Sequence, residues 1–583
     1  MRPLEALARH QARLEAEGLA APQGFAVARI AVCLSLDPSG ALAAVEDLRT
    51  GAQRRPARIL APAAPKRAKG VAAGAFWDKA SYVLGYWPPN HGKSPERVRL
   101  EHEAFLDRHR RLVEGAEDWG LVALWRFLER WEPAHAKFQP GLADLFDGNI
   151  CFRLHGDAGY LHQRPAARTA LAAERHHDLA SWSPCAITGV PGPVARTHPL
   201  IKGVAGSLST GASLVSGSLP VANSYGKSQG ANAQISQATA EAYGAALNTL
   251  LGGGLDAAAA RPAAMRLGAD TLVFWPECRR AEARVRDILE PGWRGEGAGG
   301  SEPIVAGPAL GESGPLDPAV PVHLLLLSPN AGRLAVRAFI TVPLRVLGAR
   351  LEALHRALEM HPGRPARAPL WMLVREFAPN QDPAECPPQI VGEFLRAVFE
   401  GAPLPAAALV CLMTRIRSDR RLTGLRAALL RACLAGPRPG RSDLAPPPAA
   451  LDPQEVRCAY VLGRLFAVLD AAQGWQVGWL AGGFQHGYLA QAAARPAQTF
   501  PQLLKAAQQR LKAARQAGRG ARALRLEQAL GALTHRLPPG TPYPQGLDLE
   551  GQALFFVGCY QQAEALKIPG RRGAGSQQLP DGA

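Results

Sequence analysis

Residues 323–342, HLLLLSPNAGRLAVRAFITV, decide the fold class of this chain. Two apolar runs, at 323–327 and 334–342, flank a polar turn at 328–333, which is the pattern of a β-hairpin. From Leu351 onward the apolar residues recur at helical spacing almost without interruption. We therefore expect the fold to change near residue 350, from mixed helix and strand to helix alone.

The residues before this hairpin alternate between the two patterns. An amphipathic helix at the N-terminus is followed by a strand over 25–36, and the turn at 37–40 leads into a second strand. Further on, Ser236 can cap a helix, and residues 271–275 form a buried strand. The N-terminal region therefore has a mixed core.

The fold class predicted from these patterns is α+β, with a mixed α/β N-terminal domain followed by an all-α helical-bundle C-terminal region. The first domain spans 1–350 and contains a Gly/Pro-rich, flexible insertion at about 292–318. A helical domain spans 351–449, and a C-terminal helical bundle spans 450–583, after a Pro/Gly-rich joint.

The overall charge favours a polyanionic partner, because 66 Lys and Arg stand against 49 Asp and Glu, a net charge of +17. A genome that prefers Arg and Ala codons is the alternative explanation. The nine cysteines are too far apart for a CxxC pair, which is typical of buried thiols in a reducing cytoplasm. The N-terminus carries no apolar signal core and no apolar run reaches 18 residues, so we expect a cytoplasmic protein without membrane spans.

Two stretches concentrate the features of a DNA-binding surface. Residues 54–111 hold thirteen basic and five acidic residues, and residues 179–240 contain no Asp or Glu at all. The alternatives are a solvated loop for the first and, for the second, a Gly/Ser-rich loop whose polar groups bond its own backbone. The candidate DNA contacts are Lys66, Arg67, Lys69, Lys79, Arg196, His198, Lys202, Ser213, Tyr225, Lys227, Gln229 and Asn232.

Aromatic residues in these stretches have two possible roles. Phe76, Trp77 and Tyr225 can stack on a base, although aromatic residues more often belong to the core.

A basic stripe lies near the C-terminus, where Glu527 is the only acidic residue between positions 501 and 536. Its residues recur at intervals of seven, three, four and three, while Leu504, Leu511 and Leu524 face elsewhere. The stripe is a candidate surface for single-stranded DNA, and a plain solvated helix face is the alternative. It consists of Lys505, Lys512, Arg515, Arg519 and Arg522.

Motifs of catalysis fail on spacing. The sequences Gly92-Lys93-Ser94 and Gly226-Lys227-Ser228 lack the earlier glycine of a phosphate-binding loop, and His102 and His109 are not one helical turn apart. We therefore expect no enzyme activity, no metal site and no cofactor. A metal-dependent nuclease and a structural RNA-binding protein remain the alternatives.

Blocks of the acid-free stretch resemble a known family. These blocks, at 195–204, 209–216 and 223–233, are similar to signature blocks of the large subunit of the type I-C CRISPR surveillance complex, Cascade. Similar blocks occur at 65–67, 82–85, 270–275, 327–334, 387–396, 462–469 and 556–560.

This resemblance implies a non-catalytic subunit that recognises the flanking motif (PAM) in duplex DNA while guide RNA recognises the target by pairing. It also implies a role in unwinding and R-loop formation, stabilisation of the displaced strand by the basic stripe, and recruitment of a helicase-nuclease. The implied partners are guide RNA, double-stranded target DNA, the helicase-nuclease, and the Cascade backbone, guide-processing and small subunits. The last block, 450–583, resembles the small subunit.

Overall fold

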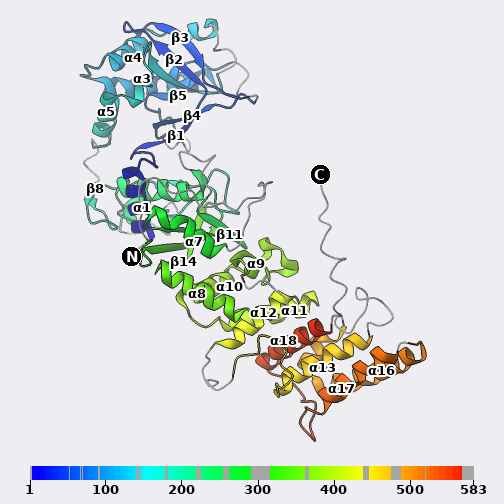
Figure 1. The fold of residues 1–583 in the computed structure, drawn as a ribbon. Helices are drawn as coiled ribbons and strands as arrows, with labels where there is room; N and C mark the ends of the chain where they lie inside the picture. Colours follow the sequence, from blue (N-terminus) through cyan, green and yellow to red (C-terminus); the bar gives the residue numbers. More distant parts are fainter. Residues whose placement is uncertain are drawn as a thin grey trace. The chain divides into compact units, whose positions relative to one another are not determined.

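A computed structural model describes most of the chain, and its residues form two compact units (Figure 1). The first comprises Met1–Gly203 and Leu208–Pro262, and the second comprises Val204–Ser207 and Ala263–Ala583. The described residues are 3–51, 53–65, 67, 70–88, 92–139, 142, 146–176, 182–217, 225–253, 262–290, 316–360, 367–436, 445–473, 487–518 and 520–566.

The first unit contains a mixed sheet with the strand order β3-β2-β6-β5, in which β2 and β6 are parallel. Strand β2 is buried along its whole length because both of its faces are covered. Val32 and Leu34 belong to a core with Phe105 and Phe127 of the helices, whereas Cys33 belongs to a separate cluster on the other face. The strands are β2 (Val32–Leu36), β3 (Leu42–Asp47), β5 (Trp77–Lys79) and β6 (Asn149–Leu154).

A two-stranded antiparallel sheet, β1 (Phe25–Ile30) with β4 (Ala57–Pro62), supplies the second cluster. The predicted strand over 25–36 is therefore two strands in different sheets, with Ala31 between them. The predicted turn after β2 is confirmed, because the Asp37 carboxylate accepts a hydrogen bond from Ala41 N at 2.9 Å. Gly40 has a φ of +88° there and lies against α4, where a Cβ would come within 2.6 Å of Arg126 Cβ.

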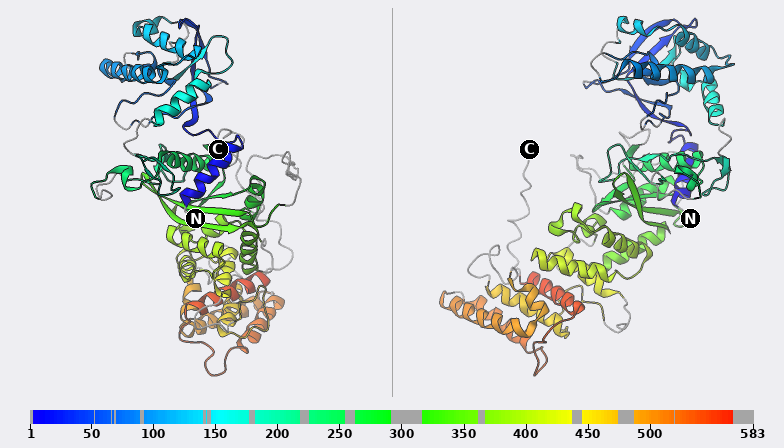
Figure 2. Two further views of the ribbon diagram at one scale, coloured as in Figure 1. Left: turned by 90° about the vertical axis from the view of Figure 1, so that its left-hand side faces the viewer. Right: turned by 180° about the vertical axis from the view of Figure 1, so that it is seen from behind.

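Helices cover the mixed sheet (Figure 2). α3 begins at Pro95 with Ser94 as its N-cap, and α4 begins at Trp119 with the Asp118 carboxylate accepting from two backbone N–H groups. The first-unit helices are α1 (Pro3–Ala16), α2 (Ala80–Val83), α3 (Pro95–Val113), α4 (Trp119–Arg130), α5 (Pro165–His176) and α6 (Gln237–Asn248).

The remainder of the first unit is built from short elements around α6, against which α1 packs. Ser236 caps α6 as predicted, accepting from Thr239 N. Two antiparallel strand pairs precede it, and a 3-10 helix, η5, lies directly before the cap. These elements are β7 (Trp182–Pro184), β8 (Pro191–Pro193), β9 (Leu200–Ile201), β10 (Ala212–Ser213) and η5 (Gln229–Asn232).

The second unit begins with strands β11 to β14, each antiparallel to the next. The hairpin predicted from residues 323–342 is confirmed as β13 and β14. Helices α7, α8 and α10 pack against these strands. Their bounds are β11 (Ala264–Leu267), β12 (Asp270–Pro276), β13 (Pro321–Asn330), β14 (Arg333–Pro343), α7 (Glu282–Leu289), α8 (Leu344–Ala357) and α10 (Pro388–Glu400).

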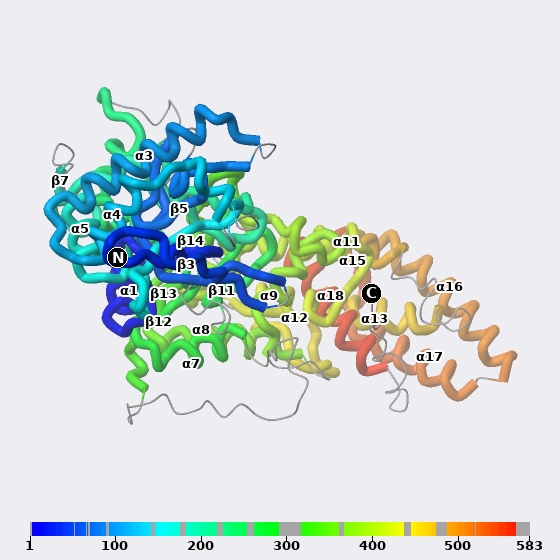
Figure 3. Tube along the Cα trace, turned by 90° about the horizontal axis from the view of Figure 1, so that it is seen from above, coloured from blue at the N-terminus to red at the C-terminus, as the bar shows by residue number. Residues whose placement is uncertain are grey.

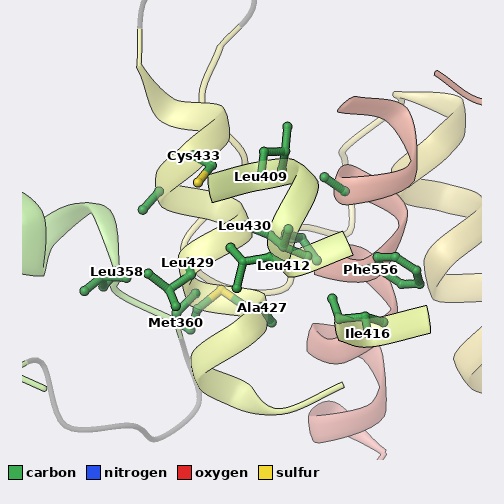
Figure 4. Packing of buried hydrophobic residues seen from close by; sticks show 14 of the residues in the cluster. Leu358, Met360, Leu409, Leu412, Ile416, Ala427, Leu429, Leu430, Cys433 and Phe556 are labelled. Atoms are coloured by element: carbon green, nitrogen blue, oxygen red, sulfur yellow. The ribbon is translucent and has the colours of Figure 1, made fainter. Parts of the chain in front are cut away.

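The rest of the second unit is helical, and one hydrophobic core runs from the strands to the last helix. Figure 4 shows part of it, where Leu412 and Ile416 of α11 and Leu430 of α12 lie close to Phe556 of α18. The remaining helices are α9 (Leu370–Arg375), α11 (Ala406–Asp419), α12 (Gly424–Ala435), α13 (Cys458–Gln473), α15 (Leu489–Ala494), α16 (Pro496–Gln516), α17 (Gly520–Thr534) and α18 (Leu549–Ala565).

The α+β fold class is confirmed, but the compact units divide near residue 262 and not at 350 or 450. The strands β11–β14 group with the helical region because α8 and α10 cover them. The C-terminal block groups with residues 351–449 because Gln561 of α18 donates to Pro448 O at 2.8 Å and α18 packs on α12. Most of the insertion predicted at 292–318 lies outside the described residues.

Candidate nucleic-acid interface

Arg67 is the one described member of the basic triplet at 66–69, since Lys66 and Lys69 lie outside the described residues. Its guanidinium forms an ion pair with the buried Asp78 and lies 4.1 Å from the centre of the Tyr82 ring. Its Nε donates to Ala72 O at 2.6 Å. Arg67 therefore fastens its own segment to the helical core, and only 27% of its side chain is exposed.

Other cations of the 54–111 stretch also have internal partners. Glu101 is buried and accepts from Lys93 at 2.5 Å and from Arg97 at 2.9 Å. Burial opposes the ionisation of Glu101, but the hydrogen bonds from Lys93, Ser81 and Arg97 together lower its pKa. Acidic residues inside and outside the stretch thus offset much of its local charge. Lys79 is exposed at the end of β5.

Arg108 shows why this pairing was invisible in the sequence. It donates two hydrogen bonds, of 2.9 and 2.7 Å, to the carboxylate of Glu174, which lies 66 positions away on α5. Only the i,i+4 pair of Arg97 with Glu101 has a spacing that a sequence pattern indicates.

The acid-free stretch brings several predicted residues together. Arg196, Lys227 and Gln229 are all exposed, and Arg196 Nη1 lies 3.4 Å from the side-chain oxygen of Gln229. A guanidinium and an amide at one exposed position offer the groups that recognise guanine and adenine edges. Lys202 is also exposed, next to β9.

Three predicted residues of this stretch have structural contacts. His198 is 6% exposed, and its Nδ1 lies 2.9 Å from the hydroxyl of Tyr243 on α6. The Asn232 amide donates to Lys227 O and Gln229 O, at 3.1 and 3.4 Å, which closes the turn around η5. Ser213 is half-buried on β10 opposite Leu200. For these residues the structure supplies the local bonding that the alternative interpretation requires.

The backbone of the loop 225–236 is strained. Tyr225, Gln229 and Gln234 have φ values of +50°, +50° and +47°, a region that side-chain-bearing residues rarely adopt. Gly230 fixes the loop, because its N–H donates to Arg196 O at 3.0 Å and a Cβ there would lie 1.7 Å from Ala195 O. Such strain persists only where the surrounding structure holds it, and it often accompanies a functional site.

The C-terminal basic stripe lies on two helices that pack side by side in the second unit (Figure 3). α16 ends before Gly518, which has a φ of +76°, and α17 begins at Gly520. Lys505, Lys512 and Arg515 are exposed on α16, and Arg522 is half-buried on α17. The stripe is thus a helical hairpin and not one continuous helix face.

Two further details of this hairpin could not be derived from spacing. Arg515 forms an ion pair with Glu527 across the two helices. Leu511 is buried as predicted, whereas Leu524 is 51% exposed. Arg510 and Arg525 are exposed basic residues of the same hairpin that the predicted stripe omitted. Arg519 lies outside the described residues.

Neither a metal centre nor a membrane span occurs in the part of the chain that the structure describes. No three His, Cys, Asp or Glu residues of this part come together in a way that could hold a metal ion. None of its helices combines the length and apolar character of a membrane span. The nine cysteines, all of them described, form no disulfide.

Comparison with known proteins identifies the family. Residues 7–567 match the family model described as CRISPR-associated protein (Cas_Csd1). No curated protein matches the chain. The matched residues include both compact units and extend from α1 to the end of α18, so the match concerns the whole architecture and not one motif. The chain therefore belongs to the Cas_Csd1 family of CRISPR-associated proteins, the large subunits of type I-C Cascade.

Proposed function

We propose that this large subunit is a non-catalytic DNA-binding protein that recognises the PAM in duplex DNA. It aids unwinding and R-loop formation, stabilises the displaced strand and recruits the helicase-nuclease. Guide RNA and the backbone, guide-processing and small subunits are its partners in the complex. The division of labour is that of RNA-guided effectors, in which pairing recognises the target and protein recognises the short motif.

The observation that carries this proposal is the exposed group of Arg196, Lys227 and Gln229 in a stretch without any acidic residue. Arginine and glutamine side chains hydrogen-bond base edges in the major groove, and lysine attracts phosphate. The 3.4 Å contact between Arg196 and Gln229 would orient both groups before DNA arrives. Lys202, exposed next to β9, is placed to add a further phosphate contact.

The helical hairpin α16–α17 supports the second part of the proposal. Single-stranded DNA is held by grooves or faces of positive charge that follow its backbone. Lys505, Lys512 and Arg515 form such an exposed face on α16, and Glu527 is the only acid of the hairpin sequence. A strand displaced by guide pairing is the single-stranded partner that this complex provides.

A substitution of Gln229 tests the recognition of the motif. In guide-loaded complexes, Gln229→Ala should weaken binding to duplex with the correct motif by about 1–3 kcal/mol, because the variant cannot form a bidentate hydrogen bond to a base edge. Binding to a scrambled motif should be unchanged. Gln389→Ala is the matched control, since Gln389 is an exposed glutamine on α10 bonded only locally to Glu393.

The outcomes separate the alternatives. Equal weakening on both duplexes would indicate a phosphate contact, and a wild-type complex without motif preference would favour a structural RNA-binding protein. Incubation of the purified chain with labelled duplex and Mg²⁺ or Mn²⁺ tests a nuclease, and metal-dependent cutting would overturn the non-catalytic assignment.

A further inference from the structure

Tyr225 differs from the other aromatic residues of the two DNA-binding candidate stretches. Phe76 and Trp77 are 0% and 8% exposed and belong to the cores of the first unit. Tyr225 is 99% exposed. A tyrosine ring with no protein surface against either face leaves its apolar area in water, which folding alone does not favour.

The backbone at Tyr225 adds to this cost. Its φ of +50° is left-handed, and it is followed by Gly226 at +70° and by Gln229 at +50°. A left-handed conformation costs a side-chain-bearing residue roughly 1–2 kcal/mol. The loop is nevertheless fixed at its base by Gly230 against Ala195 and by the Asn232 amide. An exposed ring is therefore presented from a constrained loop.

The surroundings of Tyr225 favour a nucleic-acid ligand over a protein pocket. Lys227 and Arg196 are exposed cations on the same loop and its base. No Asp or Glu occurs between residues 179 and 240, so no acid of this stretch repels phosphate. An aromatic face beside cations is the combination with which proteins hold unpaired bases.

We propose that the ring of Tyr225 stacks on a nucleobase that has lost its pairing partner next to the PAM. This inference rests on the proposed function, since only an opened duplex supplies such a base. Stacking needs the aromatic face and not the hydroxyl. Tyr225→Phe should therefore behave like the wild type, and Tyr225→Leu, which keeps apolar bulk without the ring, should not.

The test uses guide-loaded complexes and target duplex with 2-aminopurine at single positions beside the PAM. Stacking quenches the fluorescence of this base, so the wild type and Tyr225→Phe should give quenching at one position. Tyr225→Leu should leave that base bright and make the open complex roughly 5- to 150-fold less stable, the range for one stacked base. Tyr488→Leu, at a 40% exposed tyrosine of the second unit, is the matched control.

Three results would overturn the inference. Quenching and stability unchanged in Tyr225→Leu would show that the ring contacts no base, while PAM-dependent binding by the same complexes would leave the proposed function intact. Failure of Tyr225→Leu to assemble with guide RNA and the other subunits would assign the ring to a protein contact. A wild-type complex without PAM-dependent binding would end both proposals together.

Discussion

The guanidinium of Arg426 lies 2.5 Å from a carboxylate oxygen of Asp419, inside the helical part of the second unit. Only 1% of the Arg426 side chain is exposed, and its Nε lies 3.1 Å from the equally buried Glu376. Its Nη1 also donates to Arg421 O at 3.0 Å. One buried cation thus connects α9, α11 and α12 and neutralises two carboxylates.

Replacing Arg426 by Met should destabilise the protein by about 3–5 kcal/mol, because two buried carboxylates would lose their charge partner. Arg367→Met is the control, since Arg367 and its partner Glu352 are largely exposed and such pairs contribute at most about 1 kcal/mol. Chemical denaturation followed by circular dichroism measures the difference. Equal effects of the two substitutions would show that the buried cluster adds no stability.

Gly463→Ala should also be destabilising, by about 1–3 kcal/mol or more, because a Cβ at this position of α13 would lie 2.0 Å from Phe555 O on α18. The two helices can approach closely only while this position carries no side chain. Gly531→Ala is the matched control on α17, where a Cβ would meet nothing within 4 Å. It should stabilise the protein by up to about 1 kcal/mol through helix propensity. Thermal unfolding midpoints that move in the same direction would contradict the argument.

Local patterns predicted much of this fold. The hairpin β13–β14 was evident because its strands adjoin in sequence and Ser328 to Arg333 supply turn residues. The cap at Ser236 was evident for the same reason. The parallel pairing of β2 with β6, which sets Cys33 opposite Cys151, joins residues more than a hundred positions apart, and no local pattern specifies it.

The candidate site divides in the same way. Exposure of Arg196, Lys227 and Gln229 agrees with their polar, acid-free surroundings, but the burial of His198 follows from its contact with Tyr243 on a later helix. The pairing of Arg67 with Asp78 likewise depends on how the chain folds back. Charge counts predict a basic surface, and tertiary contacts decide which cations remain on it.

Stability should decline with rising pH because of Asp270, which is fully buried on β12. Burial raises the pKa of its carboxyl group, against the hydrogen bond from Ser328 and the charge of Arg337. Since the folded pKa exceeds the unfolded value of about 3.9, this contribution is complete at lower pH and is lost as the pH rises through the folded pKa. Asp270→Asn should flatten this part of the stability profile.

The control for this pH dependence is Asp287→Asn, at an exposed position of α7. It should leave the slope of unfolding free energy against pH as it is in the wild type. A profile of Asp270→Asn that keeps the wild-type slope would show that Asp270 does not take up a proton more readily in the folded state.

Neutralising Lys505 and Lys512 to Gln should weaken the hold of the complex on displaced DNA after recognition and not before it. Both lysines are exposed on α16, and their removal leaves the buried Leu511 and the ion pair of Arg515 with Glu527 in place, so the hairpin should still fold. For each single-strand phosphate that the variant no longer neutralises, the salt dependence of open-complex stability should fall by about 0.7 in log-log slope. Glu527→Gln should do the opposite, because it releases Arg515 and removes the only acid of the hairpin sequence. Permanganate footprinting of the non-target strand, together with R-loop lifetimes, measures both effects. Wild-type protection and lifetime in both variants would mean that α16 and α17 present only a solvated face.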